Sequence, residues 1–253
     1  MAEVPNRTLQ RGLDMLELLG AHAEGMALCE LAQALHLPRS TAFNLAQTLT
    51  HLGYATQRED TGKYRLGFKM FEIGAGAMHQ VDVMELIRSC MAEVHHTINE
   101  TMHLGVRAGR DTLYIDKLDS TQSIRMTSYV GARAPLHCTA LGKAILSTMD
   151  DGEVRALYAD EPLAALTPHS ITSMDCLLEQ LAAVREKGYA VEREENNENV
   201  CCVAIPLRNR EGRAVYALSV SAPSFRMGEE EIARCAGLLL GIRPRIERFL
   251  KDA

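Results

Sequence analysis

Apolar residues recur at helical spacing in three short segments at the start of the chain. The first segment is expected to begin with Thr8 as its N-cap and to end at Gly20, because glycine suits helix C-termini. The second covers residues 27–35 and stops before Pro38, since proline disfavours helical backbone in the residue before it. The third covers residues 40–52. The apolar positions are Leu9, Leu13 and Leu16, then Leu28, Leu31, Ala32 and Leu35, then Ala42, Leu45, Ala46, Leu49 and Leu52.

The third segment has a polar face opposite its leucines. We expect Ser40 or Thr41 to cap it and Gly53 to end it. The polar face carries uncharged hydrogen-bonding side chains of medium size, which can meet base edges and phosphates in a major groove. These side chains are Thr41, Asn44, Gln47, Thr48 and His51.

A hairpin is expected next, with strands at 54–58 and 63–66 around a turn at 59–62. It places Lys63 and Arg65 on a wing beside the third helix. Short turn, polar helix and basic hairpin in this order favour a winged helix-turn-helix that binds DNA. A plain three-helix bundle with a hairpin is the less favoured alternative.

The period of the pattern changes in the second part of the chain. A linker helix at 68–81 is weakened by Gly74 and Gly76, and a stronger helix begins near residue 82. Strands are expected at 102–106, 112–118, 200–207 and 214–221, and helices at 141–149, 174–186 and 229–249. This mixture predicts an α+β domain with a mostly antiparallel sheet covered by helices. We therefore divide the chain into a DNA-binding domain (1–67), a linker helix (68–81) and a second domain (82–253).

Composition adds constraints on the function. The chain has 253 residues and a formal net charge of −6, and residues 1–70 hold seven basic and seven acidic side chains. DNA binding must therefore depend on where the few basic groups lie. No apolar run approaches the ~20 residues of a membrane helix, and no secretory signal is evident. The seven cysteines, without a CxxC pair, favour a reducing cytoplasmic compartment and no zinc site; no cofactor is expected.

The second hairpin places three small polar side chains on one face of the sheet. With the turn centred between Arg210 and Glu211, Cys202 is expected opposite Ser219 and Val200 opposite Ser221. Cys202, Ser219 and Ser221 then share a face. A polar binding surface and a set of small residues that let a helix approach are equally good explanations. The other face is expected to be core, with Val203, Ile205, Leu218 and Val220.

Thr139 is expected to cap a helix that begins near Ala140. The free amides of that first turn favour an anion. Glu192 follows a predicted strand at 189–191 and is expected to point inward, whereas Glu194, Glu195 and Glu198 are interpreted as a solvated loop. His103 is interpreted as a structural histidine on the first strand.

The sequence resembles the IclR family of transcriptional regulators over nearly its whole length. The matching pieces of the N-terminal part are RGLDMLELL, ELAQALHLPRSTAFNLAQTLTHLGY and GKYRLG. The matching pieces of the second part are APLHCTALGKAIL, the run GYAVEREENNENVCCVAIPLRNREGRAVYALSVSAPSFR and the last helix. The resemblance implies a GAF-like effector-binding domain and a homodimer or homotetramer. The family includes repressors and activators, and because repression is the more frequent of the two, the resemblance implies a repressor.

The resemblance also implies an effector pocket. Its lining would be Met126, on a strand before Gly131, together with Thr139, Ala140, Leu141, Glu192, Cys202, Ser219 and Ser221. The anion-binding helix start favours a small carboxylate, and Glu192 disfavours a second one nearby and accepts hydroxyl groups instead. We therefore expect a hydroxylated monocarboxylate, such as a sugar acid, with an aromatic hydroxy acid as second choice.

On the DNA side, Arg39, Ser40 and Thr41 are expected to hold phosphates while Asn44 and Gln47 face bases. Lys63 and Arg65 would contact the backbone from the wing. Family members often carry arginine or histidine where this chain has Asn44, so base preference is expected to differ. Paired half-sites on double-stranded operator DNA require a dimer, for which the helices at 9–19 and 68–78 have spare apolar surface.

Two other functions compete with DNA-binding regulation by a small acid. A redox- or metal-responsive regulator would use Cys138 and Cys202 with His103 nearby, although free cysteines are usually small buried hydrophobes. An enzyme would need His137 and Cys138 to pair, which neighbouring residues on a strand do not easily do. No catalytic motif is present, so no enzyme activity is expected.

Overall fold

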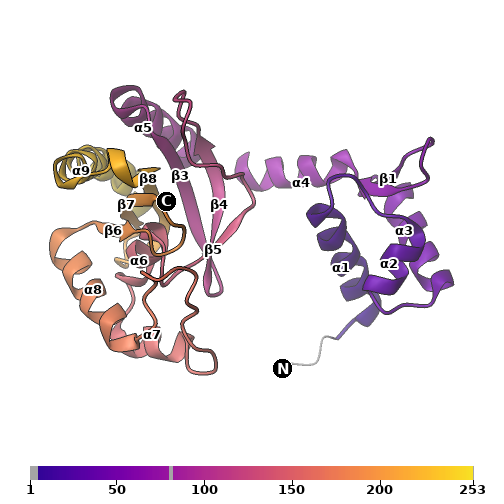
Figure 1. Cartoon of the computed structure of the whole chain (residues 1–253). Coiled ribbons are helices and arrows are strands. Elements are labelled where there is room, and N and C mark those ends of the chain that lie inside the picture. The colour runs from indigo at the N-terminus through magenta and orange to yellow at the C-terminus, as the bar shows by residue number, and fades with distance from the viewer. Residues whose placement is uncertain (1–4, 80–81, 253) are drawn as a thin grey trace. The chain divides into compact units, whose positions relative to one another are not determined.

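The computed structural model describes residues 5–79 and 82–252 and shows two compact units, residues 1–81 and 82–253. Figure 1 labels their elements. The first unit contains α1 (Arg7–Ala21), α2 (Leu28–Ala34), α3 (Arg39–His51), β1 (Ala55–Gln57), β2 (Tyr64–Leu66) and α4 (Phe68–His79). β1 and β2 form an antiparallel hairpin. The order is that of a winged helix-turn-helix followed by the expected linker helix, of which residues 80 and 81 lie outside the described part.

The core of the first unit lies between the three helices and the hairpin. Met15, Leu31, Ala42 and Tyr64 are buried in it. The hairpin is attached to the helices by two backbone hydrogen bonds between Met26 and Tyr64, of 2.9 and 2.8 Å. Gly25 precedes this contact with φ +77°, and a Cβ there would lie 2.7 Å from the carbonyl oxygen of Tyr64. A glycine is therefore needed where the wing meets the helices.

The ends of two helices differ from the expectation. α1 begins after Asn6, whose side chain accepts a hydrogen bond from the Leu9 amide at 3.0 Å, so Thr8 is not the cap and Gly20 lies inside the helix. α3 begins at Arg39 after Pro38. Ser40 and Thr41 therefore lie in its first turn and do not cap it. Pro38, which suits the start of a helix because of its fixed φ, takes the cap position without a side-chain hydrogen bond.

Three leucines of the apolar stripes are exposed instead of buried. Leu9 is 60% exposed, Leu13 51% and Leu52 55%. They lie around a groove of about 500 Å³ between α1 and α3, which is also lined by Leu45 and Leu49. The first unit alone therefore leaves part of its predicted apolar surface uncovered.

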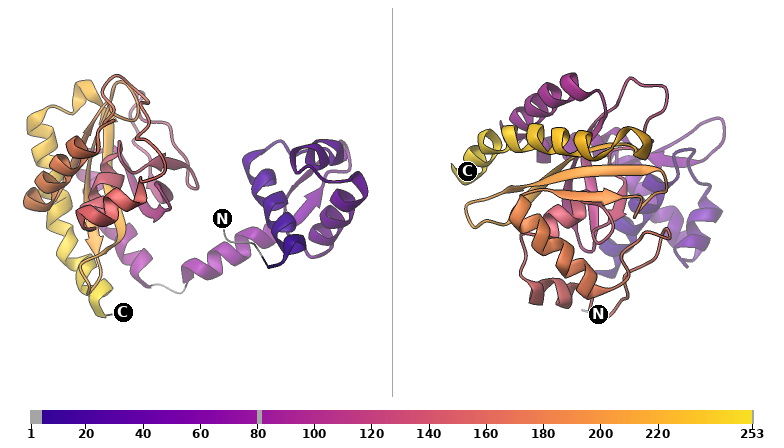
Figure 2. Two further views of the ribbon diagram at one scale, coloured as in Figure 1. Left: turned by 90° about the horizontal axis from the view of Figure 1, so that it is seen from below. Right: turned by 60° about the vertical axis from the view of Figure 1, so that its left-hand side comes forward.

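The second unit is a six-stranded antiparallel sheet with helices on both faces. Its elements are α5 (Asp82–Ile98), β3 (Thr101–Ala108), β4 (Asp111–Leu118), β5 (Arg133–Pro135), α6 (Ala140–Leu146), α7 (Asp151–Leu157), α8 (Met174–Lys187), β6 (Ala190–Arg193), β7 (Val200–Arg208), β8 (Ala214–Pro223), a 3₁₀ turn (Ser224–Arg226) and α9 (Glu229–Asp252). The strand order is β5-β4-β3-β8-β7-β6. Helices α5 and α9 cover one face and α6 covers the other (Figures 1 and 2). The α+β class is thus confirmed.

Three local expectations in the second unit were wrong. The loop between β4 and β5 carries Met126, which is not on a strand. Glu192 lies within β6 and does not follow it. The register of β7 and β8 is shifted by two residues. Arg208 pairs with Ala214, so the turn centres on Glu211, which gives one residue, and the bulge between Leu207 and Arg208 adds the second. α7 was not predicted.

Candidate functional site: an effector pocket and a DNA-binding surface

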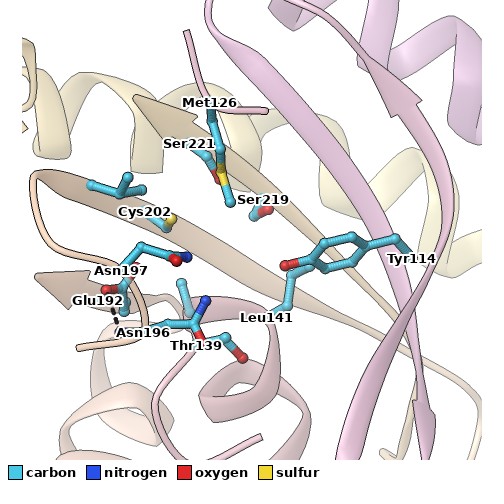
Figure 3. Close-up of a pocket in the computed structure, with 12 residues that line it drawn as sticks. Tyr114, Met126, Thr139, Leu141, Glu192, Asn196, Asn197, Cys202, Ser219 and Ser221 are labelled. Carbon is cyan, nitrogen blue, oxygen red and sulfur yellow. Dashed lines mark hydrogen bonds between the residues drawn. The ribbon is translucent and has the colours of Figure 1, made fainter. Parts of the chain in front are cut away.

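The residues of the predicted effector pocket lie around one cavity beneath α6 (Figure 3). All eight predicted residues line it: Met126, Thr139, Ala140, Leu141, Glu192, Cys202, Ser219 and Ser221. They come from the loop before β5, the start of α6 and strands β6, β7 and β8. The cavity measures about 10 Å³, room for about one water molecule. A larger ligand therefore requires the surrounding loops to move.

The register of the sheet explains why the small polar side chains converge. Cys202 pairs with Ser221, and Ala204 pairs with Ser219. A shift of two residues keeps every side chain on its face, since strand side chains alternate with a period of two. The expected convergence of Cys202, Ser219 and Ser221 is therefore present although the expected pairs were wrong. The opposite face carries Val203, Ile205, Leu218 and Val220, all fully buried as expected.

The start of α6 is packed directly against the preceding chain. The Thr139 side chain accepts a hydrogen bond from the Gly142 amide at 3.1 Å, which confirms it as the N-cap. A Cβ on Gly142 would lie 2.2 Å from the carbonyl oxygen of Leu136, so only glycine allows this approach. The amides of Ala140 and Leu141 precede the first intrahelical bonds and belong to residues that line the cavity.

Glu192 is a buried carboxyl group at the cavity. Its side chain is 2% exposed, and its Oε1 accepts hydrogen bonds from the amides of Glu195 at 2.7 Å and Asn196 at 3.3 Å. Burial raises the pKa of Glu192 to about 7, against the opposing effect of hydrogen bonds from Cys202 and these amides. The carboxyl group therefore changes between its neutral and charged forms near neutral pH.

The acidic loop after β6 is not wholly solvated. Glu195 is 7% exposed and forms an ion pair of 2.6 Å with Lys143, which is fully buried on α6. Glu194 is half-buried, and Glu198 is exposed. The expectation for Glu195 was wrong because its partner is 52 residues away in the chain, beyond the reach of local pattern. Lys143 was missed for the same reason.

Four further residues line the cavity and were not predicted: Tyr114, Asn196, Asn197 and Val200. Tyr114 lies on β4 opposite Gly105 of β3, and an aromatic residue opposite a glycine was an available signal. The two asparagines lie in an irregular loop, which has no period to show where side chains point. Nearby, His103 is 1% exposed and contacts Ser128 at 2.7 Å. Burial lowers the pKa of His103 to about 4, so the ring is neutral at neutral pH.

The thiols near the cavity are poorly suited to redox chemistry. Cys138 and Cys202 are buried and free. Burial raises the pKa of Cys138 to about 12, and it raises that of Cys202 too, which disfavours the reactive thiolate. Cys29 and Cys176, by contrast, are exposed. Among the described residues no cluster of three or more His, Cys, Asp or Glu could hold a metal ion.

His137 and Cys138 have separate partners. The ring of His137 is 2.9 Å from the carbonyl oxygen of Ala164, while the Cys138 thiol faces Asn196 at 3.8 Å. The two residues follow β5 and do not lie on it. The structure thus gives each a different local contact and does not pair them as nucleophile and base.

In the first unit, α3 presents an exposed polar face. Arg39, Ser40, Asn44 and Gln47 are exposed on it, and Thr41 is half-buried. The N-terminus of α3 has no side-chain cap, which leaves its first amides without that partner. The Gln47 amide nitrogen is 3.2 Å from the hydroxyl of Tyr64, and this contact joins α3 to the hairpin.

The hairpin places its two predicted basic residues in half-exposed positions. Lys63 and Arg65 are half-buried there, and neither forms an ion pair with another described residue. Arg58 in the same hairpin is paired with Asp60. Lys63, directly before β2, and Arg65, within β2, are thus basic side chains that form no ion pair with another described residue.

A winged helix-turn-helix followed by a separate α+β domain is the architecture of a DNA-binding transcriptional regulator. Family models agree over both parts. The IclR helix-turn-helix domain matches residues 8–59, and the C-terminal domain of bacterial transcriptional regulator IclR matches residues 75–246. The chain belongs to the IclR family, whose members are transcriptional regulators and not enzymes.

Several relatives from Escherichia coli K12 support this assignment over most of the chain. The transcriptional regulator XynR is 33% identical over 227 residues, 90% of this chain and 90% of XynR. The transcriptional regulator KdgR is 36% identical over 225 residues, 89% of this chain and 85% of KdgR. The transcriptional repressor AllR is 29% identical over 230 residues, 91% of this chain and 85% of AllR.

Solved structures show the same fold. The Thermotoga maritima IclR structure has a TM-score of 0.78 and 28% identity, and the alignment covers 96% of this chain and 98% of that one. An IclR homolog from Microbacterium hydrocarbonoxydans in complex with 4-hydroxybenzoate has a TM-score of 0.84. It is 23% identical, with 97% of this chain and 100% of that chain covered, and shows the fold alone. No helix of the described residues is long and apolar enough to cross a membrane.

Proposed function

We propose that this chain is a repressor that binds operator DNA through α3 and the hairpin and responds to a small hydroxylated monocarboxylate in the cavity beneath α6. The single observation that carries the effector part is the convergence of all eight predicted residues on one cavity. AllR, a relative over 91% of the chain, is a repressor. The homolog of the same fold holds 4-hydroxybenzoate, which is a hydroxylated monocarboxylate.

The cavity offers complementary groups for such a ligand. The amides of Ala140 and Leu141 at the start of α6 favour the carboxylate. The hydroxyl groups of Ser219 and Ser221 can donate and accept hydrogen bonds. Glu192 in its charged form accepts from ligand hydroxyls and disfavours a second carboxylate beside it.

Calorimetric titration tests this part of the proposal. The ligand is first chosen by thermal shift from a panel of hydroxylated and plain carboxylic acids. Ser219→Ala should weaken binding of that ligand by roughly 0.5–1.5 kcal/mol, because one hydrogen bond is lost. Glu192→Gln should reduce the discrimination between hydroxylated and plain acids. Ser173→Ala, at an exposed site outside the cavity, is the control. If neither cavity variant changes binding, the effector assignment is wrong.

The DNA part assigns different tasks to different residues. Arg39, Ser40 and Thr41 at the uncapped start of α3 hold phosphates, and Lys63 and Arg65 do so from the hairpin. Asn44 and Gln47 face bases, and the contact with Tyr64 holds Gln47 in place for this task. Phosphate contacts fix position, whereas base contacts give sequence preference.

Gel-shift titration on an operator selected from random duplexes tests this assignment. Arg39→Ala should weaken binding to all sequences, while Gln47→Ala should relax base preference at one position by roughly 1–3 kcal/mol. Arg155→Ala, in the second unit, serves as the control for loss of a positive charge. Unchanged operator affinity in both α3 variants would show that α3 is not the recognition helix.

A further inference from the structure

A second cavity lies at the open edge of the sheet in the second unit. β6 is the last strand of the sheet, and α8 and α9 lie on either side of it (Figure 1). The cavity between them, which we call the edge groove, measures about 400 Å³ and shares no lining residue with the effector pocket. Sites for small ligands commonly have volumes of roughly 300–1,000 Å³. Its lining includes Gln180, Lys187, Val191, Arg193, Glu195 and Glu229.

One end of the edge groove has a buried carboxylate oxygen without a partner. Glu195 lines the groove and is 7% exposed. Its Oε1 accepts a hydrogen bond from Lys143 at 2.6 Å, but its Oε2 is buried and has no hydrogen-bond partner among the described residues. A buried acceptor left unpaired is costly, so a donor that Oε2 meets when the buried carboxylate turns toward the groove would stabilise it.

The wall between the two ends is an unpaired strand edge. Hydrogen-bonded pairs alternate along antiparallel strands, and the Glu194 amide donates to the Val200 carbonyl of β7 at 2.8 Å. The backbone N–H and C=O groups of residues 190 and 192 therefore also point toward β7. Those of Val191 point the other way, into the groove. The Arg193 amide has the same outward direction, and it lies 3.5 Å from Glu195 Oε1.

The other end of the edge groove carries a positive charge. Gln180 and Lys187 lie seven residues apart on the α8 face that lines the groove, about 10 Å along the helix. Gln180 lies at the same end of the groove as Glu195, because Lys143 donates hydrogen bonds to both side chains. Arg193 is paired with Glu229 at 2.6 Å, whereas exposed Lys187 forms no ion pair with the other described residues.

We propose that the edge groove binds a free tripeptide as an added strand, antiparallel to β6. The ammonium group of the peptide donates to Glu195 Oε2, its middle residue exchanges both backbone hydrogen bonds with Val191, and its carboxylate meets Lys187. Three residues of extended chain span about 10 Å, which matches the separation of the two ends. Strand addition of this kind takes its affinity from main-chain hydrogen bonds. The site is independent of the effector assignment.

Calorimetry with the full chain and four forms of trialanine tests the proposal. Trialanine should bind saturably at neutral pH. N-acetylation, which removes the ammonium group, and C-terminal amidation, which removes the carboxylate, should each weaken binding at least ten-fold. N-methylation of the middle residue should do the same, because it removes the donor that faces the Val191 carbonyl.

A protein variant separates the carboxylate contact from nonspecific attraction. Lys187→Ala should weaken binding of trialanine at least five-fold but leave the weaker binding of the amidated form unchanged. Lys251→Ala, an exposed lysine near the end of α9, should bind trialanine like the unmodified chain. Absence of saturable trialanine binding, equal binding of the four forms, or an unaltered affinity in Lys187→Ala would each overturn the proposal.

Discussion

Glu192 couples the chemistry of the effector pocket to pH. Its folded-state pKa of about 7 lies above the ordinary value of 4.5, because the charged form loses water on burial. The neutral form is thus favoured in the folded chain. The stabilisation from this group is complete below about pH 4.5 and is lost as pH rises through 7.

Replacement of Glu192 by Gln should remove this dependence. The free energy of unfolding of the variant relative to the unmodified chain should rise between pH 5 and pH 8, by up to about 3 kcal/mol for a shift of this size. Affinity for a plain carboxylic acid, which offers no hydroxyl group to Glu192, should fall as pH rises through 7 in the unmodified chain, since two negative charges then meet, and should change little in the variant.

Thermal melts and calorimetric titrations at pH 6, 7 and 8 measure both effects. Ser219→Ala is the matched control, because it alters the same cavity and keeps the titrating group. A pH dependence that persists in Glu192→Gln would assign the titration to another group.

Individual site residues were predictable where a regular period placed them. Cys202, Ser219 and Ser221 follow from the alternation of strands, and Thr139 follows from the preference of threonine for N-caps. Glu195 was not predictable as buried, because its burial depends on Lys143 in α6. An ion pair between distant segments leaves no local pattern in either segment.

At the scale of elements, the loop between β4 and β5 controls one wall of the effector pocket. Met126 of this loop lines the cavity. Ser128 holds the loop through its hydroxyl, 2.7 Å from His103, and through its carbonyl, which accepts a hydrogen bond from Lys117 at 2.7 Å. The cavity is small, so a ligand must displace a wall, and Met126 lies on this loop, which is not part of the sheet.

Ser128→Ala should loosen this loop without unfolding the sheet. Loss of one hydrogen bond of about 1 kcal/mol corresponds to about five-fold faster hydrogen exchange of amides in residues 121–131. The Lys117 contact involves the backbone and is retained. Exchange measured by mass spectrometry checks this, with exposed Ser123→Ala in the same loop as the control. Equal exchange in both variants would show that the His103 contact does not restrain the loop.

Most elements could be predicted, but their ends and irregularities could not. Strands β3, β4, β7 and β8 lie where alternation placed them, and α8 and α9 lie where helical spacing placed them, whereas β5 was not predicted. The bulge at Leu207 and Arg208 accounts for one residue of the register shift and the centre of the turn for the other, and neither changes the pattern of apolar residues. α7 is seven residues long, too short for its period to be recognised.

At the scale of the whole molecule, exposed apolar side chains of the first unit favour self-association. Leu9, Leu13 and Leu52 surround the groove between α1 and α3, and Phe68 and Phe71 of α4 are 88% and 75% exposed. We infer that these surfaces form the dimer contact that paired half-sites require. A tetramer through the second units remains part of the same proposal.

Light scattering should therefore show a dimer or a tetramer at micromolar concentration. Leu13→Asp should shift the mass toward the monomer and weaken operator binding at least ten-fold, because a charge is placed in the apolar contact and the second half-site is lost. Leu166→Asp, at an exposed apolar site of the second unit, is the control. A monomeric mass for the unmodified chain, with or without operator, would contradict the inference.

The distribution of the cysteines has a practical consequence for following the response to an effector. Cys29 on α2 and Cys176 on α8 are exposed, one in each compact unit, whereas the other five thiols are buried. A maleimide dye pair should therefore attach at one position in each unit of the natural sequence. Energy transfer between the two dyes would report, in single molecules and without any substitution, whether ligand binding changes the distance between the DNA-binding and effector-binding units.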